Sequence, residues 1–402
     1  MAFDVAALRA QFPALESGIA HFDGPGGTQT PSVVAEAITN TLLAPLSNRG
    51  PLVASERNAD TVVDEFRLAY ADLLGVSPRG IVIGRSATQI AYDVARLLAK
   101  SWGPGDEVVV SRLDHDSNVR PWVQAAEAVG ATVVWLPLDA VTADLDLSGL
   151  DEVINYRTRL VAVTAASNLL GTKPPVARIA RRAHDVGALV YVDGVHHAAH
   201  ASVDVGALGA DFFTCSPYKF FGPHCGVLAA DPELLESLHP DKLIPSTNRV
   251  PERFELGTLP YEIMAGATAA VDFIAGIGPD VGSRRDRIVA AHHLIDEHEV
   301  RLRRRVEAGF ARFGDRVRCH SVAGERTPTL FFTFRGVDAS AVYRSLAARD
   351  VLAPAGGFYA HEAIRALDLG TDTGLRVGLA AYNDDTDIDR LLAGVADHLQ
   401  GT

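Results

Sequence analysis

The chain has 402 residues, of which 48% are hydrophobic and 22% charged, which is ordinary for a soluble globular protein of two domains. Its net charge of −13 at pH 7 argues against a nucleic-acid partner, because phosphate backbones are bound by a surplus of basic side chains. Three cysteines are too few for a disulfide framework, and no run approaches the roughly 20 apolar residues of a membrane-spanning helix. The N-terminus lacks the pattern of a secretion signal, so we expect a cytoplasmic protein with no membrane partner.

Between about residues 80 and 230 the sequence alternates short apolar runs with helical stretches. The runs are continuously apolar, which is typical of parallel strands covered by helices on both faces. We therefore predict an α/β fold with a mostly parallel central sheet flanked by helices. The predicted strands are 81–83, 107–110, 131–136, 160–164 and 189–192, and the predicted helices are 87–102, 122–129 and 176–186.

The C-terminal part has a different pattern, which favours a smaller α+β domain. Its histidines His292, His293 and His298 fall in a long helix and are expected on the solvent-facing side. We predict an N-terminal segment 1–20 that packs near the small domain, a large domain 21–282 and a small domain 283–402. The predicted elements of the small domain are a helix at 284–313, strands at 317–322 and 329–334, a helix at 339–349, a strand at 375–380 and a helix at 386–399.

Polar side chains follow four of the predicted strands of the large domain. Ligands of open α/β sheets bind beyond the carboxyl ends of the strands, so these side chains are candidates for one site. Taken singly, most of them are better read as loop residues or helix caps, and their coincidence favours a function. They are Arg85, Ser86, Ala87 and Thr88; Asp114, His115 and Asn118; Ser167 and Asn168; and Asp193, His196 and His197.

Lys219 is one of four lysines in the chain and lies in an aromatic segment, SPYKFFGP at 216–223. Partial desolvation among aromatic rings lowers the pKa of a lysine and makes its amine nucleophilic. From this segment alone, an amphipathic lysine whose charge stays in water is an equal alternative. Asp193 at a strand end changes the balance, because pyridoxal phosphate needs a lysine, a carboxylate for its pyridine nitrogen and a phosphate site.

Five segments in register resemble the class-V aminotransferases, with the closest likeness to the cysteine desulfurase and selenocysteine lyase group. The likeness runs from about His21 to Asn383. It implies a fold-type I pyridoxal-phosphate enzyme acting on a small amino acid. The segments are LDHDSNVRPW at 113–122, SNLLGT at 167–172, DGVH at 193–196, SPYK at 216–219 and RFELGT at 253–258.

The resemblance implies a role for each matching residue. Lys219 matches the Schiff-base lysine, Asp193 the partner of the pyridine nitrogen, and His115 the imidazole stacked on the cofactor. Arg376 matches the arginine that holds the substrate carboxylate, for which a planar guanidinium is suited. Thr258 matches a residue that reaches the phosphate of the neighbouring subunit, which implies a homodimer with shared active sites. The remaining matches are Ala87, Thr88, Ser216 and Tyr218 at the phosphate, and Asn168 and His196 near the ring hydroxyl of the cofactor.

Three departures from the desulfurase pattern bear on the reaction. Tyr218 replaces the usual histidine and His196 the usual glutamine, and both can still form hydrogen bonds. The third departure is a missing thiol, because the loop before the substrate arginine reads GGFYA at 356–360, without the sulfur-accepting cysteine. Cys215 and Cys225 are expected to be packing residues.

The missing thiol favours C–S or C–Se bond cleavage by elimination, with the substrate joined to the cofactor, over persulfide transfer. A class-V aminotransferase is the alternative, and a cofactor-binding protein without turnover is the third hypothesis. No metal is expected, because the cluster His196, His197 and His200 lacks the further ligands that a zinc site needs.

Overall fold

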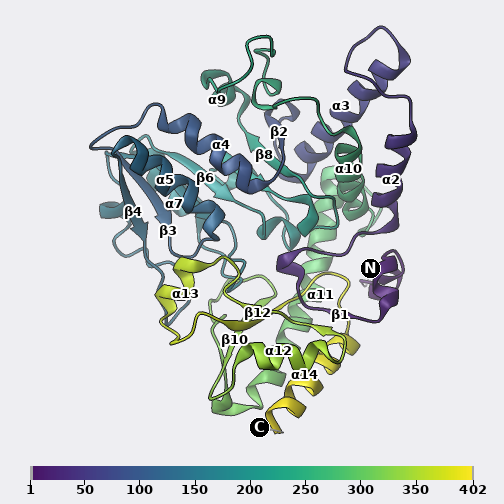
Figure 1. The fold of residues 1–402 in the computed structure, drawn as a ribbon, viewed down its shortest axis with the longest axis vertical. Coiled ribbons are helices and arrows are strands. Elements are labelled where there is room, and N and C mark those ends of the chain that lie inside the picture. The colour runs from purple at the N-terminus through teal and green to yellow at the C-terminus, as the bar shows by residue number, and fades with distance from the viewer. Residues whose placement is uncertain (1–2, 401–402) are drawn as a thin grey trace.

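The computed structural model describes residues 3–400, and a seven-stranded sheet lies at its centre (Figure 1). The strands follow the order β2-β8-β7-β6-β5-β3-β4 across the sheet. β8 is antiparallel to both of its neighbours, and the other adjacent pairs are parallel. The strands are β2 (Ile81–Gly84), β3 (Glu107–Ser111), β4 (Thr132–Leu136), β5 (Thr158–Thr164), β6 (Leu189–Asp193), β7 (Phe212–Cys215) and β8 (Gly226–Ala230).

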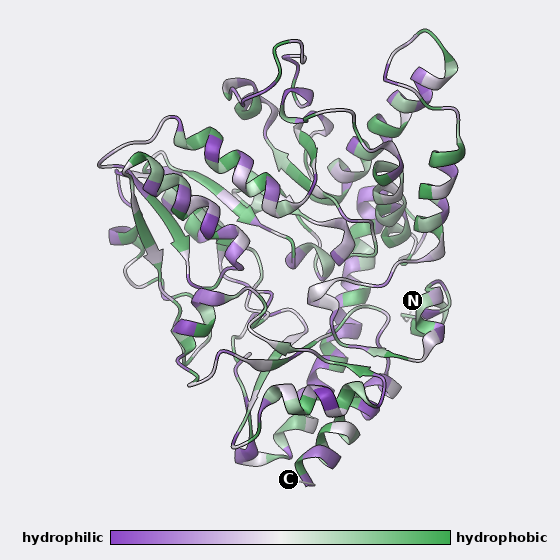
Figure 2. Cartoon of the chain, in the orientation of Figure 1, coloured by the Kyte–Doolittle hydropathy of each residue, from purple (hydrophilic) through white to green (hydrophobic). Residues whose placement is uncertain are grey.

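Both faces of this sheet are buried, which explains the apolar runs without alternation. In β3, Val108 and Val110 pack into one core and Val109 into the other. Helices α4 (Ala87–Ala99) and α5 (Arg120–Val129) cover the first face. The second face is covered by α3 (Ala54–Leu74), α7 (Val176–Asp185), α10 (Tyr261–Ala275) and the first half of α11 (Arg284–Ala311). The hydropathy colouring follows this arrangement, with green strands between helices that are green on one side and purple on the other (Figure 2).

A second sheet of four antiparallel strands lies toward the C-terminus, in the order β12-β13-β10-β9. Its core includes Leu302 and Val306 from the second half of α11, so this helix contributes to the cores of both sheets. The elements are β9 (Val317–Cys319), β10 (Thr329–Phe334), α12 (Ala339–Ala347), β12 (Ala355–Gly356), β13 (Gly374–Gly378) and α14 (Asp385–Gln400). The remaining α-helices of residues 3–400 are α1 (Val5–Arg9), α2 (Ser32–Leu43), α6 (Leu150–Val153), α8 (Val205–Leu208), α9 (Pro232–Ser237) and α13 (His361–Leu367).

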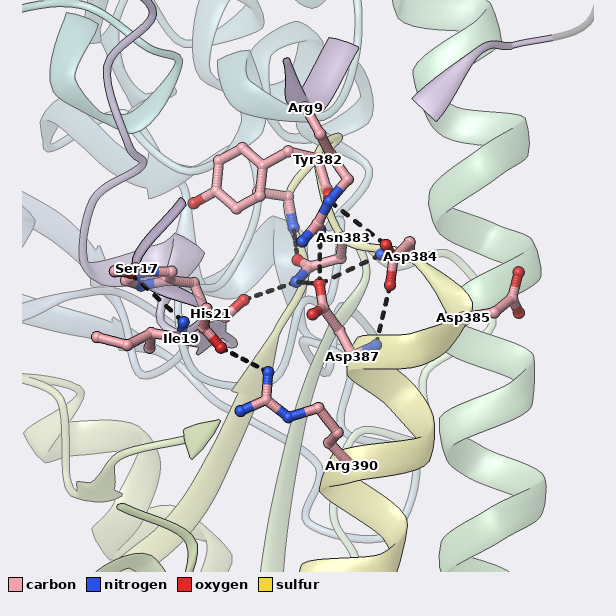
Figure 3. A network of polar contacts seen from close by, with 12 residues as sticks. Arg9, Ser17, Ile19, His21, Tyr382, Asn383, Asp384, Asp385, Asp387 and Arg390 are labelled. Carbon is pink, nitrogen blue, oxygen red and sulfur yellow. Dashed lines mark hydrogen bonds and ion pairs between the residues drawn. The ribbon is translucent and has the colours of Figure 1, made fainter. Parts of the chain in front are cut away.

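The N-terminal segment is bonded to the C-terminal part of the chain (Figure 3). β1 (Ala20–His21) pairs in parallel with β11 (Val351–Leu352). Arg9 donates to the carbonyl of Tyr382 at 2.6 Å and to Asp387 at 2.9 Å, and Arg390 donates to the carbonyl of Gly18 at 2.6 Å. These contacts are those expected of a segment that packs near a small C-terminal domain, and the domain boundaries themselves stay a prediction.

The prediction for the histidines of the long helix was wrong for two of the three. His292 and His298 are buried, with 3% and 7% of their surface exposed, and only His293 faces solvent. His292 contacts the carbonyl of Ala198 and His298 the carbonyl of Asn383, because α11 packs between the two sheets. Within residues 3–400, no helix is both long and apolar enough to cross a membrane.

Candidate active site

A cavity of about 330 Å³ lies at the carboxyl ends of the central strands, where the sheet rule places ligands. Loops after β2, β3, β5, β6 and β7 line it, and β13 of the second sheet contributes Arg376. Its lining includes every residue that matches a site residue of the family except Thr258, which is exposed on a loop elsewhere. Of the other candidates at the strand ends, Ser86 lines the cavity, whereas Arg85, Asp114, Asn118, Ser167 and His197 do not. The predicted residues it brings together are Ala87, Thr88, His115, Asn168, Asp193, His196, Ser216, Tyr218, Lys219 and Arg376.

Lys219 ends a short 3-10 helix after β7 and is buried, with 9% of its surface exposed. Its ammonium group lies 4.7 Å from the ring centroid of Tyr218 and donates to the carbonyl of Pro25. Burial and the nearby charge of Arg376 lower the pKa of Lys219 to about 7, although the charges of Asp193 and Asp23 oppose the change. Near neutral pH, a large share of this amine is therefore unprotonated and nucleophilic.

Asp193 is the last residue of β6 and lies in the same buried region. Its carboxylate accepts the backbone N–H of Val195 at 2.9 Å. Burial raises the pKa of Asp193 to about 6, although this hydrogen bond and the charge of Lys219 oppose the change. The following residue, Gly194, has no room for a side chain, because a Cβ atom there would lie 1.9 Å from the ring of Phe213.

His115 follows β3 and is held by its own turn. Its Nδ1 accepts the backbone N–H of Ser117 at 3.1 Å and lies 2.7 Å from the Ser117 hydroxyl. Burial, with the charges of Lys219 and Arg376, lowers the pKa of His115 to about 4, so the ring is neutral at pH 7. The ring of Tyr359 lies 5.4 Å away at an angle of 31°.

The N-terminus of α4 also faces the cavity. Ser86 caps this helix by accepting the backbone N–H of Gln89 at 3.1 Å, and Ala87 and Thr88 form its first turn. Unpaired N–H groups at the start of a helix, together with the helix dipole, favour bound anions such as phosphate. Ser216 and Tyr218 line the same cavity.

Arg376 lies on β13 and is buried, with 4% of its surface exposed. Its guanidinium carbon lies 3.8 Å from the ring centroid of Phe358, and its Nη1 donates to the carbonyl of Asn168 at 3.1 Å. The Asn168 side chain donates in turn to the carbonyl of Phe358 at 2.9 Å. Burial lowers the pKa of Arg376 to about 9, and Asp23 partly opposes this.

Three further residues act on the site, namely Phe358, Tyr359 and Asp23. Phe358 and Tyr359 were expected to shape the pocket, in a way that the sequence does not show, and their rings lie on Arg376 and His115. Asp23, whose charge acts on both Lys219 and Arg376, was not predicted, because it lies outside the five matching segments. Within residues 3–400, no group of three or more His, Cys, Asp or Glu side chains is arranged to hold a metal ion.

The family model of the class-V aminotransferases matches residues 20–391 of the chain. The chain belongs to this family. It is 32% identical to the cysteine desulfurase CsdA of Escherichia coli, over 98% of this chain and 97% of that protein. It is 31% identical to the aminotransferase-like protein FGM3 of Gibberella zeae, over 98% of each. The crystal structure of CsdA matches with a TM-score of 0.87 and 29% identity, over 100% of this chain and 99% of that chain.

These findings confirm the predicted family, the fold type and the likeness to cysteine desulfurases. Class-V aminotransferases use pyridoxal phosphate, and the cavity fits that group in size, since small-molecule sites span roughly 300–1,000 Å³. It also fits in chemistry, because three of its lining residues carry buried polar atoms that lack a hydrogen-bond partner within residues 3–400. These atoms are Asn168 Oδ1, His196 Nδ1 and Arg376 Nε.

The missing thiol is a feature of the cavity as well as of the loop. Among residues 3–400, none that lines the cavity is a cysteine. Cys215 and Cys225 are buried in the core, and burial raises the pKa of Cys225 to about 12. Because the thiolate is the nucleophilic form, neither of them is arranged to accept sulfur.

Proposed function

We propose that the chain is a pyridoxal-phosphate-dependent lyase that cleaves the C–S or C–Se bond of a cysteine-like amino acid. The observation that carries this proposal is one cavity in which an amine, a carboxylate and a guanidinium converge without a thiol. The desulfurase relatives support the substrate class. The lack of a thiol supports elimination as the outcome.

In this proposal Arg376 binds the carboxylate of the substrate. Phe358 covers one face of its guanidinium and leaves the edge, with the unpaired Nε, for two parallel hydrogen bonds. Lys219 would hold the cofactor through its amine and would take the proton from Cα of the substrate. Its pKa near 7 suits a group that both takes and returns a proton at neutral pH.

The other predicted residues would hold the cofactor, which when bound supplies an electron sink for charge that develops at Cα. Asp193 would pair with the pyridine nitrogen, and a cationic partner there would lower the pKa of this carboxyl again. His115 is neutral and would stack on the ring. The N-terminus of α4, with Ser216 and Tyr218, would bind the phosphate. Asn168 and His196 would meet the ring hydroxyl.

Without an acceptor thiol, the sulfur leaves with the electron pair of its bond to Cβ. Cysteine and water then give pyruvate, ammonia and hydrogen sulfide, with no oxidant or reductant needed. A desulfurase would instead give alanine and pass the sulfur to a thiol. The two outcomes therefore differ in the carbon product.

The test is a product assay on the purified holoenzyme with L-cysteine and L-selenocysteine, in which pyruvate, ammonia, sulfide and alanine are quantified. We expect pyruvate and ammonia in equal amounts. Lys219→Ala should lower the rate at least about 100-fold, as for loss of a general base, and Lys100→Ala, on the surface, should keep it. Alanine without pyruvate would contradict the lyase and would indicate a desulfurase that passes the sulfur to an external acceptor. Turnover only with an added keto acid would favour the aminotransferase, and no turnover with any donor a binding protein.

We also propose that the chain acts as a homodimer with shared active sites, in the cytoplasm, and with the domain boundaries 20/21 and 282/283. Exposed Thr258 supports the dimer, because it lies outside the cavity of its own chain. In the family likeness, this position serves the neighbouring subunit.

A further inference from the structure

A row of buried polar side chains leads from the cavity to helix α11. His196 lines the cavity, His200 lies behind it, and Glu299 of α11 ends the row. All three are buried, with 4%, 4% and 1% of their surfaces exposed. His200 Nδ1 lies 2.8 Å from Glu299 Oε2, and the rings of His200 and His196 meet edge to face with centroids 4.8 Å apart. Burial of a carboxylate is costly, so its place next to the site calls for a reason.

His196 is held on its far side as well. Its Nε2 lies 3.0 Å from the hydroxyl of Thr327 and 3.1 Å from that of Thr329, which begins β10. Its Nδ1 has no partner within residues 3–400. With Nε2 taken by two hydroxyls, Nδ1 is the nitrogen left for a group in the cavity.

We propose that Glu299 and His200 are positioning residues, which fix the ring of His196 so that its Nδ1–H donates to the ring oxygen of the cofactor. Glu299 holds His200 through one hydrogen bond, and the His200 ring blocks rotation of His196. Thr329 donates to Nε2, which places the hydrogen of the neutral ring on Nδ1, while the hydroxyl of Thr327 donates to the carbonyl of Gly171 at 3.4 Å. This inference rests on the proposed function, because it needs the cofactor in the cavity.

The charges around the row favour this protonation state. Burial, followed by the charge of His200, sets the pKa of His196 well below its usual range, and Lys219, Arg376 and His197 act in the same direction. Glu299 faces His200 and Asp296, and burial raises its pKa. His292 of α11 and His197, which the charge of His200 also reaches, both have lowered pKa values and stay neutral at pH 7.

The experiment follows the visible absorbance of the holoenzyme against pH. Donation to the ionised ring oxygen stabilises its charge, so the nitrogen that joins Lys219 to the cofactor loses its proton at lower pH. In Glu299→Met, His196 is no longer held. The pH midpoint of the absorbance change should then rise by about one pH unit, as for one lost hydrogen bond to a charged group. Glu299→Gln keeps an acceptor for His200 and should move the midpoint less than half as far.

The matched control is Glu107→Met. Glu107 is equally a buried glutamate, held by Arg157 and Asn155, and it lies at the opposite end of β3 from the cavity. The absorbance midpoint of Glu107→Met should stay at the wild-type value. Thr329→Val tests the other side of His196 with a change of the same shape, and it should raise the midpoint as Glu299→Met does.

Three results would count against the inference. An unchanged midpoint in Glu299→Met and Thr329→Val, with bound cofactor and circular dichroism retained, would overturn it and leave the proposed function intact. An equal rise in Glu107→Met would overturn it too, because the shift would then report general loosening. A wild-type protein that takes up no chromophore would overturn the proposed function itself.

Discussion

Lys219 and Arg376 share one buried cavity, and only the guanidinium keeps its full charge at neutral pH. Burial lowers the pKa of both, to about 7 for Lys219 and about 9 for Arg376. Delocalised charge is less costly to bury, so the guanidinium remains protonated at neutral pH while a large share of the amine is unprotonated. Asp23 limits both changes, and Asp193 limits the change at Lys219.

The apoprotein should therefore contain one lysine that titrates near pH 7. The chain has only four lysines, so reductive ¹³C-methylation followed by NMR titration can resolve them. We expect one methyl resonance with a midpoint near 7, absent in Lys219→Ala. Removal of the like charge in Arg376→Leu should raise that midpoint. Because the folded pKa lies below the unfolded one, the folded apoprotein binds fewer protons and gains stability as pH rises above about 7. If no lysine of the apoprotein titrated below pH 9, the proposed role of Lys219 would be contradicted.

At the scale of elements, the site depends on where strands end and helices begin. β3, β5, β6 and β7 carry His115, Asn168, Asp193 and Lys219 to one edge, because parallel strands end on the same side of a sheet. The antiparallel strand β8 contributes to the site in a different way, through its contact with α4. Its first residue, Gly226, lies against the start of α4, where a Cβ atom would come within 2.4 Å of Ser86 C and 2.6 Å of Ala87 N.

Gly226→Ala should therefore displace the first turn of α4 and weaken cofactor binding. We expect the affinity for pyridoxal phosphate to fall at least about tenfold and the free energy of unfolding to fall by about 1–3 kcal/mol. Fluorescence titration and urea unfolding measure the two. Gly103→Ala, where a Cβ would meet nothing within 4 Å, is the control. Equal affinity for pyridoxal phosphate in both variants would contradict the proposal that the N-terminus of α4 binds the phosphate.

At the scale of the whole molecule, the cavity needs two sheets. Arg376 comes from the antiparallel C-terminal sheet, and the contacts of Arg9 and Arg390 bind the N-terminal segment to that same region (Figure 3). Glu299 reaches His200 only because α11 packs against both cores. The geometry of the site is therefore fixed by contacts between segments far apart in sequence.

The proposed dimer gives a prediction at this scale. Sedimentation should give twice the chain mass of 42.8 kDa. Thr258→Val should weaken pyridoxal-phosphate binding about tenfold or more, as for one lost hydrogen bond to a charged group. Thr386→Val, equally exposed at the start of α14, should bind normally. A monomeric protein with full affinity in Thr258→Val would exclude shared sites.

The sequence by itself determined the features that depend on residues close together along the chain. The buried strands were predictable because parallel strands need apolar side chains on both faces, and Lys219 because its segment and spacing from Asp193 match a family pattern. Tertiary structure alone decided which face of α11 is buried, that Phe358 covers Arg376, and that Glu299 meets His200. A helical period does not reveal which neighbours a helix will have, and a pair 99 positions apart leaves no local signal. These contacts form only when the two sheets pack together.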